Sequence, residues 1–493
     1  MGDIFLELKD IHKSFGGVQA LRGVDLTIRS GEIHCLAGEN GSGKSTLIKV
    51  ISGAHHPTKG EIFIEGSRIP RLNPIDAIAH GIQVIYQDFA VFPNLTVAEN
   101  IALNRAVTTG AKWMNWENAR KLALDAMEQI GAKMDPDLLV ENLSVANRQM
   151  VAICRTIINE AKLLILDEPT ASLTANEVDK LNAILRRLKN KGIAVMIVNH
   201  KVDEIFEIAE RLTILRNGEK ISTGLVGEYD RKRFVRDLTG RELLSSGYVP
   251  LPSDEEIFRV EHLGRKGAFE DVSFTLRKGD VLGITGLLDS GRGQIGDALF
   301  GIAPADSGKI YLHGEEISIR STEDAVKQKI AYVPEDRLTQ GLFLDRSIQD
   351  NTIAASIKKY FRSGRLDESA MYQETAEWID RIGCVAPSPE PAVRTLSGGN
   401  AQKIVIAKWL NMNPALIILN GPTNGVDVGA KFDIHKILHN LAAQGIGVIL
   451  ISDDLSELIQ NCNSILIMKD RRMSSLIQAA EVNETRLAGM LSE

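Results

Sequence analysis

The chain repeats itself at the length of a whole domain. Gly38, Gly43 and Gly53 each have a matching glycine 248 residues later, and LSVAN at Leu143 has a counterpart, LSGGN at Leu396, 253 residues later. Solenoid repeats have periods of about 20 to 50 residues, so this repeat is far too long to be one. The 493 residues therefore hold two homologous halves, which should fold in the same way.

The two halves are expected to be separate domains, spanning residues 1–240 and 257–493, with a linker at 241–256. The linker sequence, RELLSSGYVPLPSDEE, has the serine, proline and acidic content of an exposed connection. Within each half, apolar runs rich in β-branched residues end in glycine-rich or aspartate-rich turns, and amphipathic helices follow, which predicts an α/β fold. The expected elements of the first half are a strand at 31–38, a helix at 45–53, buried parallel strands at 163–167 and 194–198, and an amphipathic helix at 117–131.

Composition and charge argue against several classes of protein. Apolar residues make up 44% of the chain and charged residues 25%, and the net charge of −7 gives no general affinity for nucleic acid. The acidic start MGDIFLELKD is not expected to be a secretory signal, and apolar runs such as LLIL are much shorter than the roughly 20 residues of a membrane span. The four cysteines form no CxxC pair, so we expect neither zinc nor disulfides, and a reducing cytoplasm suits the chain.

The first half carries a phosphate-binding loop with the pattern G-x-x-x-x-G-K-[ST]. Its glycines let backbone N–H groups turn toward phosphate oxygens, and the helix that follows adds the positive end of its dipole. The lysine should reach the β- and γ-phosphates, and the serine after it should bind Mg²⁺ through its hydroxyl. The predicted nucleotide-binding residues are Gly38, Glu39, Asn40, Gly41, Ser42, Gly43, Lys44, Ser45 and Thr46.

Two carboxylates follow the apolar run LLIL. Ligands of open α/β sheets bind at the carboxyl ends of the strands, which is where Asp167 and Glu168 should lie. We expect Asp167 to support Mg²⁺, directly or through water, and Glu168 to polarise the attacking water as general base. An Asp-Glu pair is often only a helix cap, but the phosphate loop before it and Pro169-Thr170 after it favour the catalytic interpretation.

In their order and spacing, these motifs resemble those of ATP-binding cassette (ABC) domains. The resemblance implies two tandem P-loop domains, each with a RecA-like α/β core, an antiparallel β subdomain and a helical subdomain. It also implies roles for three further residues of the first half. Phe15 in KSFGGVQAL would stack on adenine, and Gln87 in VIYQD would touch Mg²⁺ or water and sense a membrane partner. His200 in VNHKVDE would contact the γ-phosphate.

The signature motif of the family, LSGGQ or close to it, differs between the halves. In the family, its serine and glycine backbone groups face the γ-phosphate across a dimer. The first half reads LSVAN, in which Val145 and Ala146 add Cβ atoms where the backbone should approach phosphate closely. The second half keeps an intact signature, whose predicted nucleotide-binding residues are Ser397, Gly398, Gly399 and Asn400.

The second half has lost the chemical groups of the first pocket. Arg292 stands in the place of Lys44, and Gly293 in the place of Ser45, so the Mg²⁺ hydroxyl is missing. Asp289 adds a negative charge inside the loop. The other replacements are Glu335 for Gln87, Asn420 for Asp167, Gly421 for Glu168 and Asp453 for His200.

If the two halves pair head to tail, as ABC domains do, all of the altered residues belong to one of the two composite sites. One composite site joins the first half's phosphate loop, carboxylates, Gln87 and His200 to Ser397, Gly399 and Asp427, and it is complete. The other joins the altered second pocket to Val145, Ala146 and Thr174, and it has no full catalytic set. We therefore expect one site to hydrolyse ATP. Whether the other still holds a nucleotide, through Arg292 and backbone N–H groups, stays open.

Over nearly its whole length, the chain is most similar to the fused ATPase subunits of bacterial monosaccharide importers of the ribose, galactose, arabinose and xylose type. The shared features are GENGSGKST, LSVAN, PEDR at 334–337, LSGGN, GVDVGAK at 425–431 and SDDLSE at 452–457. In that family, the second half usually keeps DEPT and a hydroxyl after the arginine. Asn420-Gly421 and Gly293 depart from this pattern.

The resemblance implies an ATPase that powers import of a small solute, most simply a monosaccharide, at the cytoplasmic face of the membrane. The implied partners are a permease dimer served by one fused copy and, indirectly, an extracytoplasmic solute-binding protein, with no nucleic acid. The segment DFAVFPNLTVAEN would receive permease helices on Phe89, Val91 and Phe92, unless these residues belong to the core of the helical subdomain.

Two other functions are alternatives to a role in solute import. A tandem ABC ATPase can act on ribosomes or DNA, but the short linker, the broken second site and the absence of paired cysteines argue against this function. A non-hydrolysing regulatory module is the other alternative, and the intact first pocket argues against it.

Overall fold

The computed structural model describes residues 2–86, 90–108, 115–170, 173, 175–199, 201–242, 253–362 and 364–492. The side chains of residues 104–108, 175 and 492 are also left undescribed. The chain divides into two compact units, Met1–Leu243 and Leu244–Glu493. Each unit is described by itself below.

The core of unit 1 is a six-stranded, mostly parallel sheet with the order β10-β9-β3-β8-β7-β6. Strand β3 lies at its centre, parallel to β8 on one side and β9 on the other. All six residues of β3 are buried, as expected for a strand that is covered on both faces. The strands are β3 (Ile33–Gly38), β6 (Ile82–Ile85), β7 (Leu163–Asp167), β8 (Ala194–Asn199), β9 (Arg211–Arg216) and β10 (Glu219–Leu225).

A second sheet in unit 1 is antiparallel, with the order β2-β1-β4-β5. Its inward side chains pack with those of helix α1 (Lys44–Ile51) and of the parallel sheet in one apolar cluster. The strands are β1 (Ile4–Phe15), β2 (Val18–Arg29), β4 (Lys59–Ile64) and β5 (Ser67–Ile69), and the short helix α2 (Pro74–Ala79) follows them.

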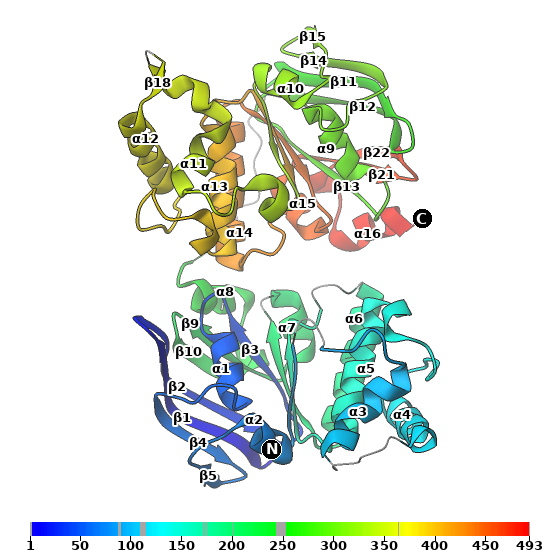
Figure 1. Cartoon of the computed structure of the whole chain (residues 1–493). Helices are drawn as coiled ribbons and strands as arrows, with labels where there is room; N and C mark the ends of the chain where they lie inside the picture. Colours follow the sequence, from blue (N-terminus) through cyan, green and yellow to red (C-terminus); the bar gives the residue numbers. More distant parts are fainter. Residues whose placement is uncertain are drawn as a thin grey trace. The chain divides into compact units, whose positions relative to one another are not determined.

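Helices α3 (Val97–Thr108), α4 (Trp116–Ile130) and α5 (Val145–Ile158) form a separate helical part, which Figure 1 shows at the side of unit 1 away from the antiparallel sheet. Helix α4 begins at an Asn115 N-cap and ends at Gly131, whose φ of 74° suits the left-handed cap that glycine tolerates best. The remaining helices of the unit are α6 (Ala175–Asn190), α7 (Val202–Ile208) and α8 (Arg231–Thr239).

Unit 2 repeats this architecture. Its antiparallel and parallel strands form one sheet, in the order β15-β14-β11-β12-β22-β21-β13-β20-β19-β16, because a single bridge between Glu270 and Arg472 joins the two parts. The strands are β11 (Glu256–Arg265), β12 (Phe269–Arg277), β13 (Val281–Gly286), β14 (Ser307–Leu312), β15 (Glu315–Ile317), β16 (Ile330–Val333), β19 (Leu416–Asn420), β20 (Gly447–Ile451), β21 (Ser464–Lys469) and β22 (Arg472–Gln478).

The helices of unit 2 follow the same plan, with α11, α12 and α13 forming its helical part (Figure 1). A two-stranded hairpin, β17 (Phe361–Arg362) and β18 (Arg365–Leu366), lies between α11 and α12 in the chain. The helices are α9 (Arg292–Phe300), α10 (Thr322–Lys327), α11 (Ile348–Ile353), α12 (Glu368–Arg381), α13 (Gly398–Leu410), α14 (Val428–Ala443), α15 (Leu455–Asn461) and α16 (Glu484–Ser492).

The predicted α/β class and the predicted elements of the first half are confirmed, with boundaries that differ by only a few residues. The run predicted as a strand at 31–38 is β3, and the two runs predicted as buried parallel strands are β7 and β8. Strand β8 pairs in parallel with both β3 and β7. Of the helices in the described ranges, none is long and apolar enough to cross a membrane.

Candidate active site

The phosphate loop of unit 1 connects the end of β3 to the start of α1. Gly43 has a φ of 105°, and a Cβ at this position would lie 2.7 Å from the carbonyl oxygen of Ala20. A Cβ at Gly38 would lie 2.7 Å from the carbonyl oxygen of Leu215. Both positions therefore require glycine, for conformation at Gly43 and for space at both. The sequence predicts a tight loop here, and the structure shows that a side chain would clash with the carbonyl oxygens of Ala20 and Leu215.

Lys44 and Ser42 are buried in this loop. The Lys44 Nζ donates to the carbonyl oxygens of Gly38 and Glu39, at 2.7 and 2.9 Å, so the ammonium group is held across the mouth of the loop. The Ser42 Oγ is buried without a hydrogen-bond partner among the described residues. A buried hydroxyl with no partner is costly, and a phosphate oxygen would satisfy it. The loop thus fits a bound polyphosphate.

Asp167 is the last residue of β7, and Glu168 begins the turn after it. Burial, together with the nearby charge of Glu168, raises the pKa of Asp167, while Lys44 and Lys49 act in the opposite direction. Glu168 has a left-handed backbone, with a φ of 46°, and its N–H donates to the carbonyl oxygen of Val198 at 3.0 Å. The strained turn is thereby tied to the neighbouring strand β8.

The other residues predicted for the first pocket are only partly described. Ser45 is exposed at the start of α1, and Thr46 is half-buried. Phe15 is 44% exposed, with its ring 5.2 Å from that of His55 in an edge-on arrangement and with the Lys13 Nζ 5.1 Å from the ring centroid. Glu39 is half-buried and Asn40 exposed. Gln87, His200 and Thr174 lie outside the described residues.

The phosphate loop of unit 2 keeps the backbone shape of the first. Gly291 has a φ of 89°, and Asp289 takes the left-handed conformation that Gly41 has in unit 1, with a φ of 67° against 80°. The Ser290 Oγ is buried and without a partner among the described residues, as in unit 1. Arg292 donates to the carbonyl oxygen of Gly286 at 2.6 Å, just as Lys44 donates to that of Gly38.

The chemistry around this second loop is different. Arg292 forms an ion pair with Asp453 at 3.4 Å, so a carboxylate already faces the group that replaces the lysine. Asn420 turns its amide toward the Tyr332 hydroxyl, at 3.3 Å. Leu287 and Leu288 are 56% and 87% exposed on the loop, in the positions of Glu39 and Asn40. The backbone of the loop is preserved, but Gly293 and Asn420 stand where unit 1 has the Ser45 hydroxyl and the Asp167 carboxylate.

The intact signature of unit 2 begins helix α13. Ser397 is the N-cap, and its Oγ accepts from the Asn400 side-chain amide at 3.0 Å. A Cβ at Gly399 would overlap the Cβ of Ala430, and its site lies 3.7 Å from the Asp427 carboxylate. Asp427 also caps helix α14 through the N–H of Ala430, at 2.8 Å.

The altered signature of unit 1 begins helix α5 in the same way. Ser144 is the N-cap and accepts from the N–H of Asn147 at 3.3 Å. Val145 is 39% exposed and Ala146 is buried. The helix start is therefore preserved without the glycines, and the change is one of surface shape.

Two groups of functional interest were missed from the sequence. Arg337, in PEDR, donates to the carbonyl oxygens of Asn424 and Gly425 at 2.5 and 3.1 Å, which holds the turn beside the signature. Glu204 accepts from the side chains of Thr170 and Asn199. The repeat could have indicated the second group, since Glu204 and Glu457 lie 253 residues apart, as do Thr170 and Thr423.

Comparison with known proteins agrees with this geometry. The sequence model of the ABC transporter family matches residues 21–171 and 269–424. The ribose import ATP-binding protein RbsA of Caldanaerobacter subterraneus is 39% identical over 98% of both chains, and that of Bacillus subtilis is 36% identical over 98% of both chains. A solved ATP-binding cassette of an ABC transporter, in its ADP conformation, is 26% identical over 48% of this chain and 100% of its own length, with a TM-score of 0.44.

The fold and the two phosphate loops define a protein with two nucleotide-binding cassettes. The chain belongs to the ABC transporter family, and it is an ATPase of that family whose two cassettes lie in one polypeptide.

Proposed function

We propose that the chain powers import of a monosaccharide, with one hydrolytic composite site and one degenerate site. The observation that carries the proposal is the complementary pattern of loss. The phosphate pocket of the first half keeps every group expected for hydrolysis, and the signature of the second half keeps its glycines. The phosphate pocket of the second half and the signature of the first half, which would form the other composite site, are both altered. Independent decay of the two halves gives no reason for all contributors to one site to survive. The full-length relatives are ribose import ATP-binding proteins, and this similarity supports a sugar as solute.

In the proposed reaction, water attacks the γ-phosphorus of ATP and displaces ADP. Lys44 binds the β- and γ-phosphates, and Glu168 accepts the proton of the attacking water. Mg²⁺, when bound, would neutralise charge on the phosphates, and the oxygen donors of Ser45 and Asp167 suit this hard cation. Gln87 and His200 are proposed to complete the first pocket, and Phe15 to stack on the adenine.

The other half of the hydrolytic site is proposed to come from Ser397, Gly398, Gly399 and Asn400. ATP would join the cassettes, because groups from both contact the γ-phosphate, and hydrolysis would remove that link. This clamp would drive a permease dimer from its cytoplasmic face, with one fused copy per dimer and a solute-binding protein on the other side.

Two matching surface groups support a permease partner. Phe92 in unit 1 is 47% exposed, and its backbone N–H and carbonyl are both bonded to the buried side chain of Asn100, at 2.8 and 2.9 Å. Phe343 in unit 2 is 61% exposed and is held in the same way by Asn351, at 2.8 and 3.0 Å. An exposed aromatic side chain on a backbone fixed by hydrogen bonds suits a binding anchor.

The residues predicted to receive permease helices differ in their burial. Val91 is half-buried and packs against the apolar cluster of the helical part, so it follows the core alternative. Phe92 is the exposed member, and Phe89 lies outside the described residues.

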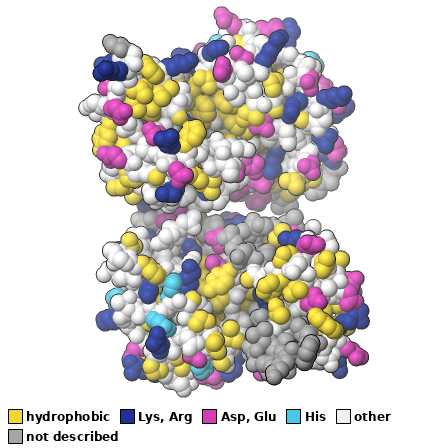
Figure 2. Space-filling view, in the orientation of Figure 1, with side chains coloured by type: hydrophobic (Ala, Val, Ile, Leu, Met, Phe, Trp, Pro, Cys, Tyr) yellow, Lys and Arg dark blue, Asp and Glu magenta, His cyan; other side chains and the backbone are white. Residues whose placement is uncertain are grey.

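The face of each unit drawn in Figure 2 lends the ribosome or nucleic-acid alternative no support. Figure 2 shows lysine and arginine side chains interspersed with aspartate and glutamate over the visible face of each unit. Nucleic-acid binding relies on clustered positive charge.

The test compares ATP turnover of the chain, in complex with its permease, for wild type, Lys44→Ala and Arg292→Ala. We expect Lys44→Ala to abolish turnover, because it removes the cation that binds the β- and γ-phosphates. We expect Arg292→Ala to leave the turnover rate within about twofold, because the second pocket is proposed not to hydrolyse ATP; each 1.4 kcal/mol of lost transition-state stabilisation would lower the rate about tenfold. Equal losses in both variants would show that the second pocket takes part in the catalytic cycle. Glu168→Gln should bind ATP without turning it over.

A further inference from the structure

A single carboxylate in unit 1 connects two turns that carry catalytic residues. The Glu204 Oε2 accepts from the Thr170 hydroxyl and, at 2.7 Å, from the Asn199 side-chain amide, while its Oε1 accepts from Lys201 Nζ at 2.9 Å. Thr170 is buried, and the Glu204 side chain is 19% exposed. The bonds are therefore largely shielded from water.

Each partner of Glu204 is close in the chain to a residue of the first pocket. Thr170 lies two residues after Glu168, in the turn that follows β7. Asn199 ends β8 and immediately precedes His200. The Asn199 Oδ1 also accepts from the N–H of Lys201, at 2.9 Å, so this side chain bonds both to Glu204 and to the backbone at the start of α7.

The Glu168 turn needs an external support, because its backbone is strained. Glu168 has a φ of 46°, a conformation that is unfavourable for a residue with a side chain. Two described contacts tie this turn to β8: the Glu168 N–H donates to the Val198 carbonyl, at 3.0 Å, and Glu204 accepts from both Thr170 and Asn199.

Unit 2 contains a corresponding bridge without the chemistry. Glu457 accepts from the Thr423 hydroxyl on Oε1, at 2.8 Å, and from the Ser452 hydroxyl on Oε2, at 2.6 Å, and its Oε1 also lies 2.7 Å from His435 Nε2. Ser452 also accepts from the N–H of Asp454, at 3.1 Å. The Gly421 N–H donates to the Ile451 carbonyl at 2.8 Å, as Glu168 does to Val198. The chain thus supplies its own matched control, in which the support is present but the base and the switch histidine are replaced.

We propose that Glu204 is a positioning residue for hydrolysis, which holds the general-base turn and the strand end before His200 in register through Thr170 and Asn199. The inference rests on the proposed function of Glu168. The role is geometric, since both bonds converge on one carboxylate oxygen and an amide oxygen could accept both.

The first experiment compares Thr170→Val with Thr423→Val in the full chain with its permease, with MgATP as substrate. Valine has the shape of threonine but donates no hydrogen bond, so both variants should fold. We expect Thr170→Val to lower kcat about 10-fold to 100-fold with little change in KM, because small misplacements of a reacting group cost about this much. Thr423→Val should keep kcat within about twofold. Equal effects of the two variants, or an unchanged kcat in Thr170→Val, would overturn the proposal.

Hydrogen exchange supplies a readout that needs no nucleotide. Removal of the bridge should speed exchange of the backbone amides of Asp167, Glu168 and residue 170 about tenfold in Thr170→Val, and of Asn420, Gly421 and residue 423 in Thr423→Val, since Pro169 and Pro422 have no N–H. Unchanged exchange at 167–170 would show that the bridge does not hold the turn.

The conservative variant separates geometry from charge. Glu204→Gln should retain kcat within about threefold, whereas Glu204→Ala should lose it as Thr170→Val does. Equal losses in Glu204→Gln and Glu204→Ala would refute a positioning role. Glu168→Gln is measured in parallel: normal turnover in that variant would refute the proposed base itself, whereas an inactive Glu168→Gln beside a normal Thr170→Val would refute only the positioning by Glu204.

Discussion

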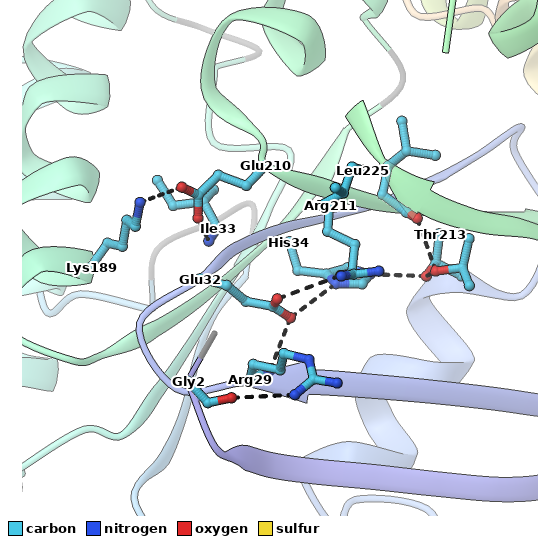
Figure 3. A network of polar contacts seen from close by, with 12 residues as sticks. Gly2, Arg29, Glu32, Ile33, His34, Lys189, Glu210, Arg211, Thr213 and Leu225 are labelled. Atoms are coloured by element: carbon cyan, nitrogen blue, oxygen red, sulfur yellow. Dashed lines mark hydrogen bonds and ion pairs between the residues drawn. The ribbon is translucent and has the colours of Figure 1, made fainter. Parts of the chain in front are cut away.

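A buried polar network at the start of β3 offers a sharp test of how charge stabilises unit 1 (Figure 3). His34 is fully buried, with its Nδ1 3.4 Å from Glu32 Oε1 and its Nε2 2.9 Å from Thr213 Oγ1. Thr223 donates to the Leu212 carbonyl at 3.0 Å, so Thr213 must donate to Thr223, at 2.8 Å. Thr213 therefore accepts from His34 Nε2, and His34 can donate to Thr213 and to Glu32 together only as an imidazolium, in which both ring nitrogens carry a hydrogen.

Glu32 is the anionic member of this network. Burial opposes its ionisation, but the hydrogen bonds from His34 and from the Arg29 N–H, at 2.9 Å, outweigh burial and hold the pKa of Glu32 below its usual value of 4.5. An acid whose pKa is depressed by folding stabilises the folded state at pH values above its unfolded pKa. This contribution is lost as the pH falls below 4.5 and through the folded value.

We predict that Glu32→Gln destabilises unit 1 at pH 7. The Arg29 and His34 hydrogen bonds both reach Glu32 Oε1, so a glutamine oxygen can still accept both. Hydrogen bonds to charged groups contribute about 1.5–3 kcal/mol each and those to neutral groups about 0.5–1.5 kcal/mol, so removing the charge should cost about 2 kcal/mol in total. For a unit of this size, that loss lowers Tm by about 4–8 °C. The difference from wild type should shrink in acid, since the wild-type carboxylate is then protonated as well.

Differential scanning calorimetry of the nucleotide-free chain at several pH values measures this effect. Glu210→Gln is the matched control, because Glu210 is 45% exposed and pairs with Lys189 at the surface, where an ion pair contributes at most about 1 kcal/mol. An unchanged Tm in Glu32→Gln at pH 7, or a deficit that grows as the pH falls, would refute the reasoning.

Three further predictions follow from other sites. Gly399→Ala should destabilise unit 2 by about 1–3 kcal/mol in a thermal melt, because its Cβ would overlap that of Ala430; an unchanged melt would contradict the close packing. Asp167→Asn should raise the Tm of the nucleotide-free chain at pH 7, because burial and Glu168 raise the pKa of Asp167; this gain should vanish at pH values below 3.8, where the carboxylate is neutral in both states. The four cysteines are all buried, and burial raises the pKa of the Cys35 thiol to about 12, so fewer than one thiol should react rapidly with a thiol reagent at pH 8 until the chain is unfolded.

Local backbone requirements made much of the site predictable. The phosphate loop is formed by consecutive residues, so its pattern is visible in the sequence. Its glycines are required, because a Cβ at Gly38 or Gly43 would have no room. The runs before Lys44 and Glu168 are apolar because the strands β3 and β7 are buried on both faces. The repeat then exposed the asymmetry, because each altered residue could be compared with its counterpart in the same chain.

Contacts between residues far apart in the sequence could not be predicted from local patterns. The Glu204 bridge joins residues 34 apart, and nothing in the local pattern marks Thr170 as its partner. The ion pair between Arg292 and Asp453 likewise spans 161 residues of sequence. Such pairs depend on which strands are neighbours in the sheet.

The sequence by itself therefore determined the two cassettes, the phosphate loops and the asymmetry between the pockets, because each is encoded by a short run of residues or by the repeat. Only the tertiary structure decided what surrounds these groups: the burial that shifts the pKa of Asp167, the bonds that hold Lys44, and the carboxylate that braces the Glu168 turn. The reason is physical. The chain order β3, β7, β8, β9 becomes the spatial order β9-β3-β8-β7, and it is this crossover that brings the strand ends together at one site.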